Sequence, residues 1–181
     1  NIAPDKITEL GADAKKGALY NSKKPKLLVI VIGESARAES FSLNGYARQT
    51  NPLLGKRNLF NFKNVSSCGT NTATSLPCMF SNLGRDGYDE KQAGGQENLI
   101  DVIRHSGLFL EWEDNNTGSK GIANRIEQAD MSKLENGNRL CSEKGCYDAV
   151  FFKHLEDEFK EHPGDMVLVF HQIGSHGPAY F

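Results

Sequence analysis

Residues 26–32 read KLLVIVI, an unbroken apolar run that has the length of one β-strand and ends at Gly33. Such a run is typical of a strand buried on both faces of a sheet. A second run of the same kind, DMVLVFH, occupies residues 165–171. The two runs predict two buried strands, one near each end of the chain.

The sequence between these runs alternates between helical and strand-like patterns. Residues 97–105 and 147–160 carry apolar side chains at helical spacing. Residues 108–112, with the sequence LFLEW, are a further strand candidate. Because strands that alternate with helices are typical of βαβ units, the pattern favours an α/β fold with a parallel sheet.

Polar segments follow the predicted strands at the points where the strands end. They are residues 33–37 (GESAR), 114–120 (DNNTGSK) and 172–178 (QIGSHGP). In open α/β sheets, ligands bind just beyond the carboxyl ends of the strands. The sequence therefore predicts a ligand site built from these three segments.

Length and composition limit the class of protein. The chain has 181 residues, 38% of them hydrophobic, which suits one globular domain with a sizeable core. Its net charge of -2 gives no electrostatic reason to expect a nucleic-acid partner. No run reaches the roughly 18 apolar residues of a membrane-spanning helix, so we expect the chain itself to be soluble. Residues 1–25 are polar and indicate a linker or surface arm before a domain at residues 26–181.

The four cysteines form two pairs that are close in sequence: Cys68 and Cys78, and Cys141 and Cys146. Two local disulfides are one interpretation, and a metal site built from four thiolates is the other. The spacings of ten and five residues do not resemble the CxxC pattern that such metal sites favour. Disulfides are therefore favoured, and they indicate an oxidising compartment. Residues 133–145 are polar and predict an exposed loop closed by the second pair.

Glu34 follows the first predicted strand immediately, within GESAR. Its carboxylate could face a crevice as a metal ligand or a general base. The alternative is a structural role, because the helix dipole favours a glutamate in the first turn of a helix. This segment taken alone favours the structural role.

Residues 66–81, SSCGTNTATSLPCMFS, concentrate hydroxyl groups between two cysteines. A hydroxyl at the start of a helix can act as a nucleophile, activated by a metal, while backbone N–H groups bind a phosphate. A helix with a threonine-rich, capped first turn is an equally good interpretation. Composition does not decide which of Thr70, Thr72 and Thr74 would act.

Lysine and histidine residues supply further candidates near the strand ends. Lys120 could meet a phosphate, although a solvated surface lysine is the commoner case. His171 and His176 flank a glycine-containing turn after a strand, where imidazole can bind a metal or transfer a proton. The remaining histidines, which we expect to be ordinary surface residues, are His105, His154 and His162.

Four segments together resemble the phosphoethanolamine transferases, a family that includes the lipid A enzymes and the mobile colistin-resistance proteins. They are GES around Glu34, CGTNTATSLPCMFS from Cys68, DNNTGSKG from Asp114 and HQIGSHGPAYF from His171, in the order of the family. The resemblance implies an alkaline-phosphatase-like, or sulfatase-like, α/β sandwich with a mainly parallel central sheet and helices on both faces.

The same resemblance implies an activity and a location. A hydroxyl nucleophile on a zinc ion, Zn²⁺, takes phosphoethanolamine from phosphatidylethanolamine and passes it to a lipid A phosphate, which confers resistance to polymyxin and colistin. The protein would act at the periplasmic face of the bacterial inner membrane, to which an N-terminal membrane domain attaches it.

Carried over by position, the resemblance assigns roles to individual residues. Thr72 would be the nucleophile and, together with Glu34, a zinc ligand. His176 would protonate the leaving group or help to activate the acceptor, and His171 would be structural. The phosphoethanolamine pocket would be lined by Asn116, Thr117, Lys120 and His176, with the lysine offsetting phosphate charge in the transition state. The family's disulfides would correspond to Cys68–Cys78 and Cys141–Cys146.

The sequence departs from the family pattern in its metal ligands. The zinc site of the family also takes an aspartate and a histidine from a DHGE segment, which the 181 residues do not contain. Zinc sites usually have three or four protein ligands, so we expect Glu34 and Thr72 alone to bind zinc weakly. We also expect the chain to be the N-terminal part of the catalytic domain, incomplete at its C-terminus and inactive alone.

Two other functions are compatible with the residues. A phosphatase or sulfatase of the same superfamily would release its group to water, although Thr72 stands where sulfatases carry the cysteine that becomes formylglycine. A non-catalytic module would keep the fold and bind lipid head groups or anionic glycans.

Overall fold

A computed structural model describes residues 6–21, 23–133, 139–143 and 145–177. Within this part of the chain, a four-stranded sheet has the strand order β1, β6, β2, β3, and all neighbouring strands are parallel. The strands are β1 (Leu27–Ile32), β2 (Phe109–Asp114), β3 (Glu127–Asp130) and β6 (Met166–His171). A small antiparallel hairpin consists of β4 (Cys141–Ser142) and β5 (Gly145–Cys146).

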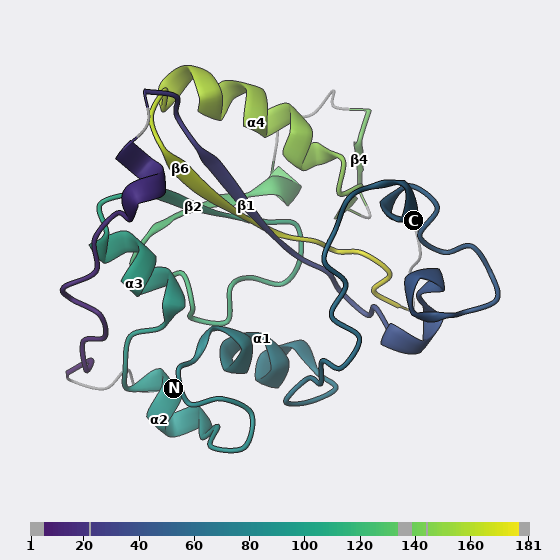
Figure 1. The fold of residues 1–181 in the computed structure, drawn as a ribbon, viewed down its shortest axis with the longest axis horizontal. Coiled ribbons are helices and arrows are strands. Elements are labelled where there is room, and N and C mark those ends of the chain that lie inside the picture. The colour runs from purple at the N-terminus through teal and green to yellow at the C-terminus, as the bar shows by residue number, and fades with distance from the viewer. Residues whose placement is uncertain (1–5, 22, 134–138, 144, 178–181) are drawn as a thin grey trace.

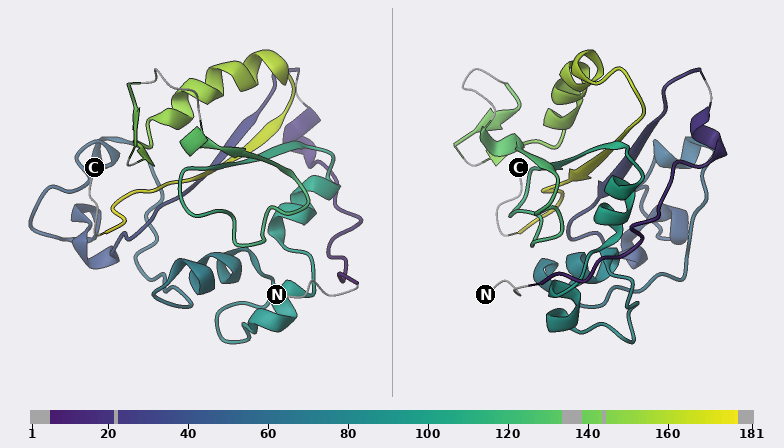
Figure 2. Two further views of the ribbon diagram at one scale, coloured as in Figure 1. Left: turned by 180° about the vertical axis from the view of Figure 1, so that it is seen from behind. Right: turned by 90° about the vertical axis from the view of Figure 1, so that its left-hand side faces the viewer.

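Helices cover both faces of the sheet. They are α1 (Thr72–Phe80), α2 (Glu90–Gly94), α3 (Leu99–His105) and α4 (Val150–Glu161). Figures 1 and 2 show α4 beside one face of the sheet, with α1, α2 and α3 beyond the other. The predicted α/β fold with a parallel sheet and helices on both faces is confirmed.

Each face of the sheet has its own apolar core. On one side, Leu76 and Phe80 of α1 and Ile100 of α3 pack with Trp112 and Val169 of the sheet. On the other side, α4 packs against β6, with contacts among Val150, Phe151, Leu168 and Phe170. Successive side chains of a strand point to opposite faces, so β2 and β6 serve both cores at once.

The register of the strands brings three strand ends to one level. Ile32 at the end of β1 is paired with His171 at the end of β6, and His171 is paired with Asp114 at the end of β2. The residues that follow these three ends therefore emerge side by side. This edge is where the sequence predicts the ligand site.

The predicted strands and helices are confirmed, with one error of burial. β1 is an edge strand of the described sheet, and Leu28 and Val31 remain 46% and 57% exposed, so the prediction of burial on both faces is wrong for β1. β6, which has a neighbour on each side, is buried along its whole length. The sequence pattern did not predict β3 or α2, because both are short and polar.

The segment before β1 lies along the surface. Thr8 forms a parallel bridge with Gln96, and the Leu10 N–H donates to the Glu97 carboxylate at 3.0 Å. This agrees with a surface arm, while the domain boundary at residue 26 stays a prediction. In the predicted loop at residues 133–145, positions 134–138 and 144 lie outside the described residues. Within the described ranges, none of the helices has the length and apolar character needed to cross a membrane.

Candidate functional site

A threonine hydroxyl and a carboxylate meet at the edge formed by the strand ends. Glu34 lies two residues beyond β1, and Thr72 is the first residue of α1. The Thr72 Oγ1 donates a hydrogen bond to the Glu34 Oε2 at 2.8 Å. α1 begins at Thr72 because the side chain of Asn71 caps the helix by accepting from the Thr74 N–H at 2.9 Å. The first N–H groups of a helix have no partner within the helix, so Thr72 stands where an anion is favoured.

Several donors surround the Glu34 carboxylate. Its Oε1 accepts from the backbone N–H and the hydroxyl of Ser35, and its Oε2 accepts from Thr72 and, at 3.4 Å, from Asn116. Burial raises the pKa of Glu34, but the hydrogen bonds from Thr72, Ser35 and Asn116 outweigh it, so the pKa is lowered overall. Glu34 is therefore an anion at neutral pH, as a metal ligand must be.

The loop after β2 joins the three strand ends. The Asp114 Oδ1 accepts from the backbone N–H groups of Asn116 and Gly118, at 2.9 and 3.0 Å, and so shapes the loop. The Asn116 amide then donates to the Gln172 carbonyl at 2.8 Å and reaches Glu34. Its Oδ1 is buried and has no hydrogen-bond partner among the described residues, which leaves one acceptor available beside Glu34.

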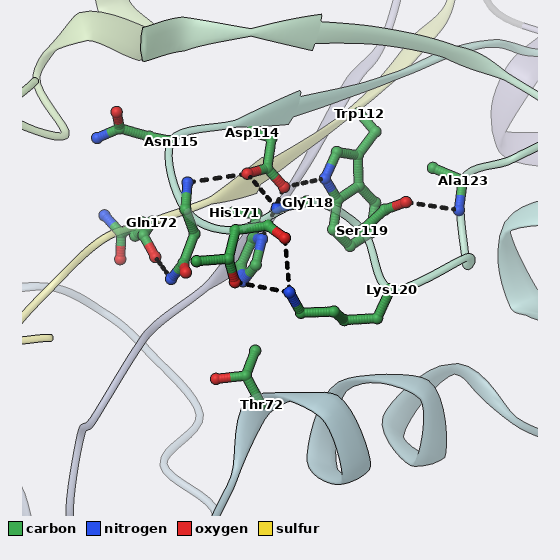
Figure 3. A network of polar contacts seen from close by, with 12 residues as sticks. Thr72, Trp112, Asp114, Asn115, Gly118, Ser119, Lys120, Ala123, His171 and Gln172 are labelled. Atoms are coloured by element: carbon green, nitrogen blue, oxygen red, sulfur yellow. Dashed lines mark hydrogen bonds and ion pairs between the residues drawn. The ribbon is translucent and has the colours of Figure 1, made fainter. Parts of the chain in front are cut away.

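Asp114 also anchors the loop to the core (Figure 3). Its Oδ2 accepts from the Trp112 indole N–H at 2.9 Å and lies 2.8 Å from the His171 Nδ1. Burial raises the pKa of Asp114, but the bonds from His171, Trp112, Gly118 and Asn116 lower it to about 2. His171 is 1% exposed, which suits the structural role given to it. No individual role was predicted for Asp114, although its position at the end of a buried strand was a usable signal.

Lys120 and Thr117 form the outer part of the same loop. The Lys120 ammonium donates to the Thr117 carbonyl at 2.5 Å and to its hydroxyl at 2.7 Å. Lys120 has a positive φ of 54°, which is uncommon for a residue with a side chain. Figure 3 shows Lys120 extending on the side of the loop where Thr72 begins α1. The structure thus joins Glu34, Thr72 and Asn116 directly and places a cation on their side of the loop.

His176 lies on the turn after β6, and its side chain is exposed. Asp148 holds this turn by accepting from the backbone N–H groups of Ile173 and Gly174, both at 2.9 Å. The backbone of the turn also touches Glu34, because a Cβ added at Gly174 would lie 2.9 Å from the Glu34 carbonyl oxygen. His176 therefore belongs to a turn whose backbone contacts Glu34. Its role in catalysis stays a prediction.

Replacing Gly174 by alanine is expected to destabilise the protein. The added Cβ would clash with Glu34, and the backbone φ of +53° disfavours a residue with a side chain. We expect a loss of about 1–2 kcal/mol in the free energy of unfolding, measured with a denaturant. Gly164→Ala is the matched control, since its Cβ would meet no atom within 4 Å. Equal losses in the two variants would contradict the close approach of the turn to Glu34.

The cysteines are paired as the sequence predicts. Disulfides join Cys68 to Cys78 and Cys141 to Cys146, so the four thiolates do not form a metal site. The first disulfide ties the segment before Thr72 to the buried side of α1, because Cys78 lies within that helix. It therefore supports the position of the candidate nucleophile.

The donors at the strand ends fit zinc as part of a coordination shell. A carboxylate and a hydroxyl whose oxygens lie 2.8 Å apart can both reach one ion at ordinary Zn–O distances of about 2.0–2.2 Å. Glu34 is ionised, and oxygen donors of this kind occur in catalytic zinc sites. Since zinc usually has three or four protein ligands, this pair supplies only part of a site.

The three histidines predicted as ordinary surface residues are partly exposed, and each has a partner among the described residues. The His105 Nε2 lies 2.7 Å from the Glu97 carboxylate. His162 stacks on Phe109 with ring centroids 3.6 Å apart. His154 lies 3.3 Å from the Glu158 carboxylate. The periodicity of a helix does not show which neighbours cover its polar face.

Residues 26–181 match the Sulfatase family, so the chain belongs to that family. The predicted sulfatase-like fold is thereby confirmed.

Within this family, the chain is similar to phosphoethanolamine transferases. It is 43% identical to phosphoethanolamine transferase EptA of Escherichia coli strain K12 and 41% identical to phosphatidylethanolamine transferase Mcr-1 of Escherichia coli, over 97% and 99% of its length. The integral membrane protein lipooligosaccharide phosphoethanolamine transferase A (EptA) from Neisseria meningitidis has a TM-score of 0.89 at 38% identity over 99% of this chain. These matches confirm the resemblance. The chain spans 32%, 34% and 33% of these three proteins.

Proposed function

We propose that this chain is part of the catalytic domain of a lipid A phosphoethanolamine transferase in which Thr72 is the nucleophile. The observation that carries the proposal is the 2.8 Å contact between the Thr72 hydroxyl and the Glu34 carboxylate at the start of α1. This position combines an oriented hydroxyl, a negative ligand for a metal and a helix N-terminus that favours phosphate.

The reaction proceeds in two displacements at phosphorus. The Thr72 hydroxyl gives up its proton to solvent, and its oxygen forms a bond to the phosphorus of phosphatidylethanolamine while the bond from phosphorus to the diacylglycerol oxygen breaks. His176 donates a proton to that leaving oxygen, and the phosphoethanolamine group stays on Thr72. A lipid A phosphate oxygen then attacks the same phosphorus, and the Thr72 oxygen leaves and takes up a proton from solvent.

Glu34 and Thr72 are the residues of this chain that would hold the Zn²⁺ cofactor. When bound, zinc supplies a Lewis acid that lowers the pKa of a coordinated hydroxyl by several units, so that a threonine can react at neutral pH. Glu34 orients the Thr72 hydroxyl through their hydrogen bond. We propose that further ligands come from outside these 181 residues and that the chain alone is inactive.

The loop after β2 binds the transferred group. The Lys120 ammonium donates hydrogen bonds to two oxygen atoms of Thr117. A phosphoryl oxygen of the substrate would accept a hydrogen bond from the same ammonium group. There, Lys120 offsets the negative charge that develops on phosphate. The buried Oδ1 of Asn116 accepts no hydrogen bond from the part of the chain that the structure describes, so it offers an acceptor to the ethanolamine ammonium group.

The proposed location is the periplasmic face of the bacterial inner membrane. Two disulfides agree with an oxidising compartment such as the periplasm. The Neisseria relative is an integral membrane protein, so we propose that a membrane domain brings the site to its lipid donor and acceptor. Polymyxin and colistin resistance would follow from the modified lipid A.

A covalent adduct tests the proposed function. The longest natural protein that contains these residues is incubated with phosphatidylethanolamine and zinc, without acceptor, and its peptides are analysed by mass spectrometry under non-reducing conditions. We expect phosphoethanolamine on the peptide that carries Thr72. An unmodified Thr72, or an adduct on Thr70 or Thr74, would contradict the proposal. Rapid release of the group to water would instead favour a phosphatase.

A further inference from the structure

Four ionisable side chains meet between β2 and α4, away from the site described above. Glu111 and Glu113 belong to β2, and His154 and Glu158 belong to α4. Ligand atoms of Glu111, Glu113 and His154 lie within 4.8 Å of one another. The His154 Nε2 lies 3.6 Å from the Glu111 carboxylate and 3.3 Å from that of Glu158, so Glu158 adjoins the group. We call these four residues the β2–α4 cluster.

The β2–α4 cluster lies on the opposite face of the sheet from the core beneath the Thr72 site. Trp112 packs with α1 and α3, whereas Glu111 and Glu113 alternate with it along β2 and so point to the α4 side. Their partners across the sheet register are Leu168 and Phe170, both members of the apolar core under α4. The carboxylates therefore stand within an apolar layer.

Burial leaves several polar atoms of the β2–α4 cluster without hydrogen-bond partners. Glu113 is 0% exposed, and neither of its carboxylate oxygens has a partner among the described residues. One carboxylate oxygen each of Glu111 and Glu158, and the Nε2 of His154, are also buried and make no hydrogen bond within the described ranges. Buried polar groups in proteins are nearly always satisfied, and an unpaired buried carboxylate is costly. The convergence of these atoms points to a ligand that satisfies several of them together.

We propose that Glu111, Glu113 and His154, with Glu158 beside them, bind a divalent transition-metal ion that joins α4 to the sheet. A cation is the ligand that suits carboxylates converging in an apolar layer, because it offsets their charge and fills their lone pairs. One imidazole together with carboxylates favours ions such as Zn²⁺ or Mn²⁺, whereas Ca²⁺ and Mg²⁺ prefer oxygen ligands alone. Since Glu111 and Glu113 are buried, the ion would enter as the chain folds, and its role is structural.

Protonation is the competing way to remove the buried charge. Burial, together with the neighbouring carboxylates, raises the pKa of Glu113 to about 8 and that of Glu111 to about 7. Without a metal, Glu113 would hold a proton at neutral pH, and Glu111 would be protonated in part of the molecules. A bound ion and bound protons are therefore alternatives, and direct measurement of metal content separates them.

The test measures metal content after refolding. The 181-residue chain is unfolded in a denaturant that contains EDTA, which removes any bound metal. It is then refolded with Zn²⁺ or Mn²⁺, desalted and analysed by elemental mass spectrometry. A Glu34→Ala background removes a ligand of the proposed catalytic zinc. We expect one retained ion per chain in that background, and a higher unfolding temperature with the metal than without it. Glu113→Gln and His154→Asn should each weaken retention by more than about tenfold.

Glu156→Gln is the matched control, because Glu156 lies on the same helix α4 and is exposed. It should retain the ion like the parent, and near-ultraviolet circular dichroism should show that all variants are folded. The proposal is overturned if the refolded parent holds no ion in the Glu34→Ala background. It is also overturned if the folded Glu113→Gln variant retains as much metal as Glu156→Gln. Neither result depends on the proposed transferase activity, so the two proposals fail separately.

Discussion

Thr72→Ala should abolish phosphoethanolamine transfer, with a loss of about 10⁴-fold or more in rate, as is usual when a covalent nucleophile is removed. The variant lacks the oxygen that would bind phosphorus, and Glu34 loses its 2.8 Å donor. Thr72→Ser keeps a hydroxyl at the start of α1 and should retain part of the activity. The measurement is transfer of labelled phosphoethanolamine from phosphatidylethanolamine to lipid A by the longest natural protein containing these residues.

Thr74→Ala is the control for this experiment. Thr74 lies in the same first turn of α1, where its backbone N–H bonds to the Asn71 cap. Its side chain lies beside Gly69, since a Cβ added there would come within 3.1 Å of the Thr74 methyl group. We expect Thr74→Ala to retain activity within about tenfold, provided that the protein stays folded. Comparable activity of Thr72→Ala and the parent would exclude Thr72 as the nucleophile.

The strands β1 and β6 were predictable because each is an unbroken run of apolar residues. β6 lies between two parallel neighbours, so an unbroken apolar run such as MVLVFH is required of it. β1 has the same apolar composition but lies at the edge of the described sheet. The sequence of a strand does not show how many neighbouring strands it pairs with. β3 was not predicted because its four residues, EQAD, carry no apolar pattern.

The site was predictable in its segments and less so in its individual residues. All three polar segments at the strand ends meet, because the strands are parallel and end in register. Choosing Thr72 from three threonines required the resemblance, since composition does not show where α1 begins. The structure adds a physical reason, because the cap formed by Asn71 starts the helix at Thr72, whose hydroxyl then bonds to Glu34.

The burial of the two glutamates of β2, Glu111 and Glu113, was not predicted from the sequence. In FLEWED, the glutamates occupy alternate positions of β2, as they would if one face of the sheet met water. The structure covers that face with α4, and Glu113 becomes fully buried. Whether a helix covers a strand depends on tertiary packing, which a local pattern does not contain.

Asp114→Asn is expected to destabilise the fold by about 3 kcal/mol, because it breaks a buried network of charged hydrogen bonds. An asparagine oxygen can still accept from the loop N–H groups, but its NH₂ group would face the indole N–H of Trp112, which can only donate. His171 could adjust its tautomer, whereas Trp112 could not. Urea unfolding at neutral pH measures the loss.

The same residue should govern stability in acid. Hydrogen bonding lowers the pKa of Asp114 in the fold to about 2, below its unfolded value of about 3.9. The stability that Asp114 contributes, about 3 kcal/mol, is then fully present above pH ~4 and is lost as the pH falls through about 2. Asp114→Asn should lack this part of the acid dependence, whereas Asp157→Asn, at an exposed position on α4, should keep it. If parent and Asp114→Asn lost stability in parallel between those pH values, the carboxylate of Asp114 would not be the group that holds Trp112 and His171 together.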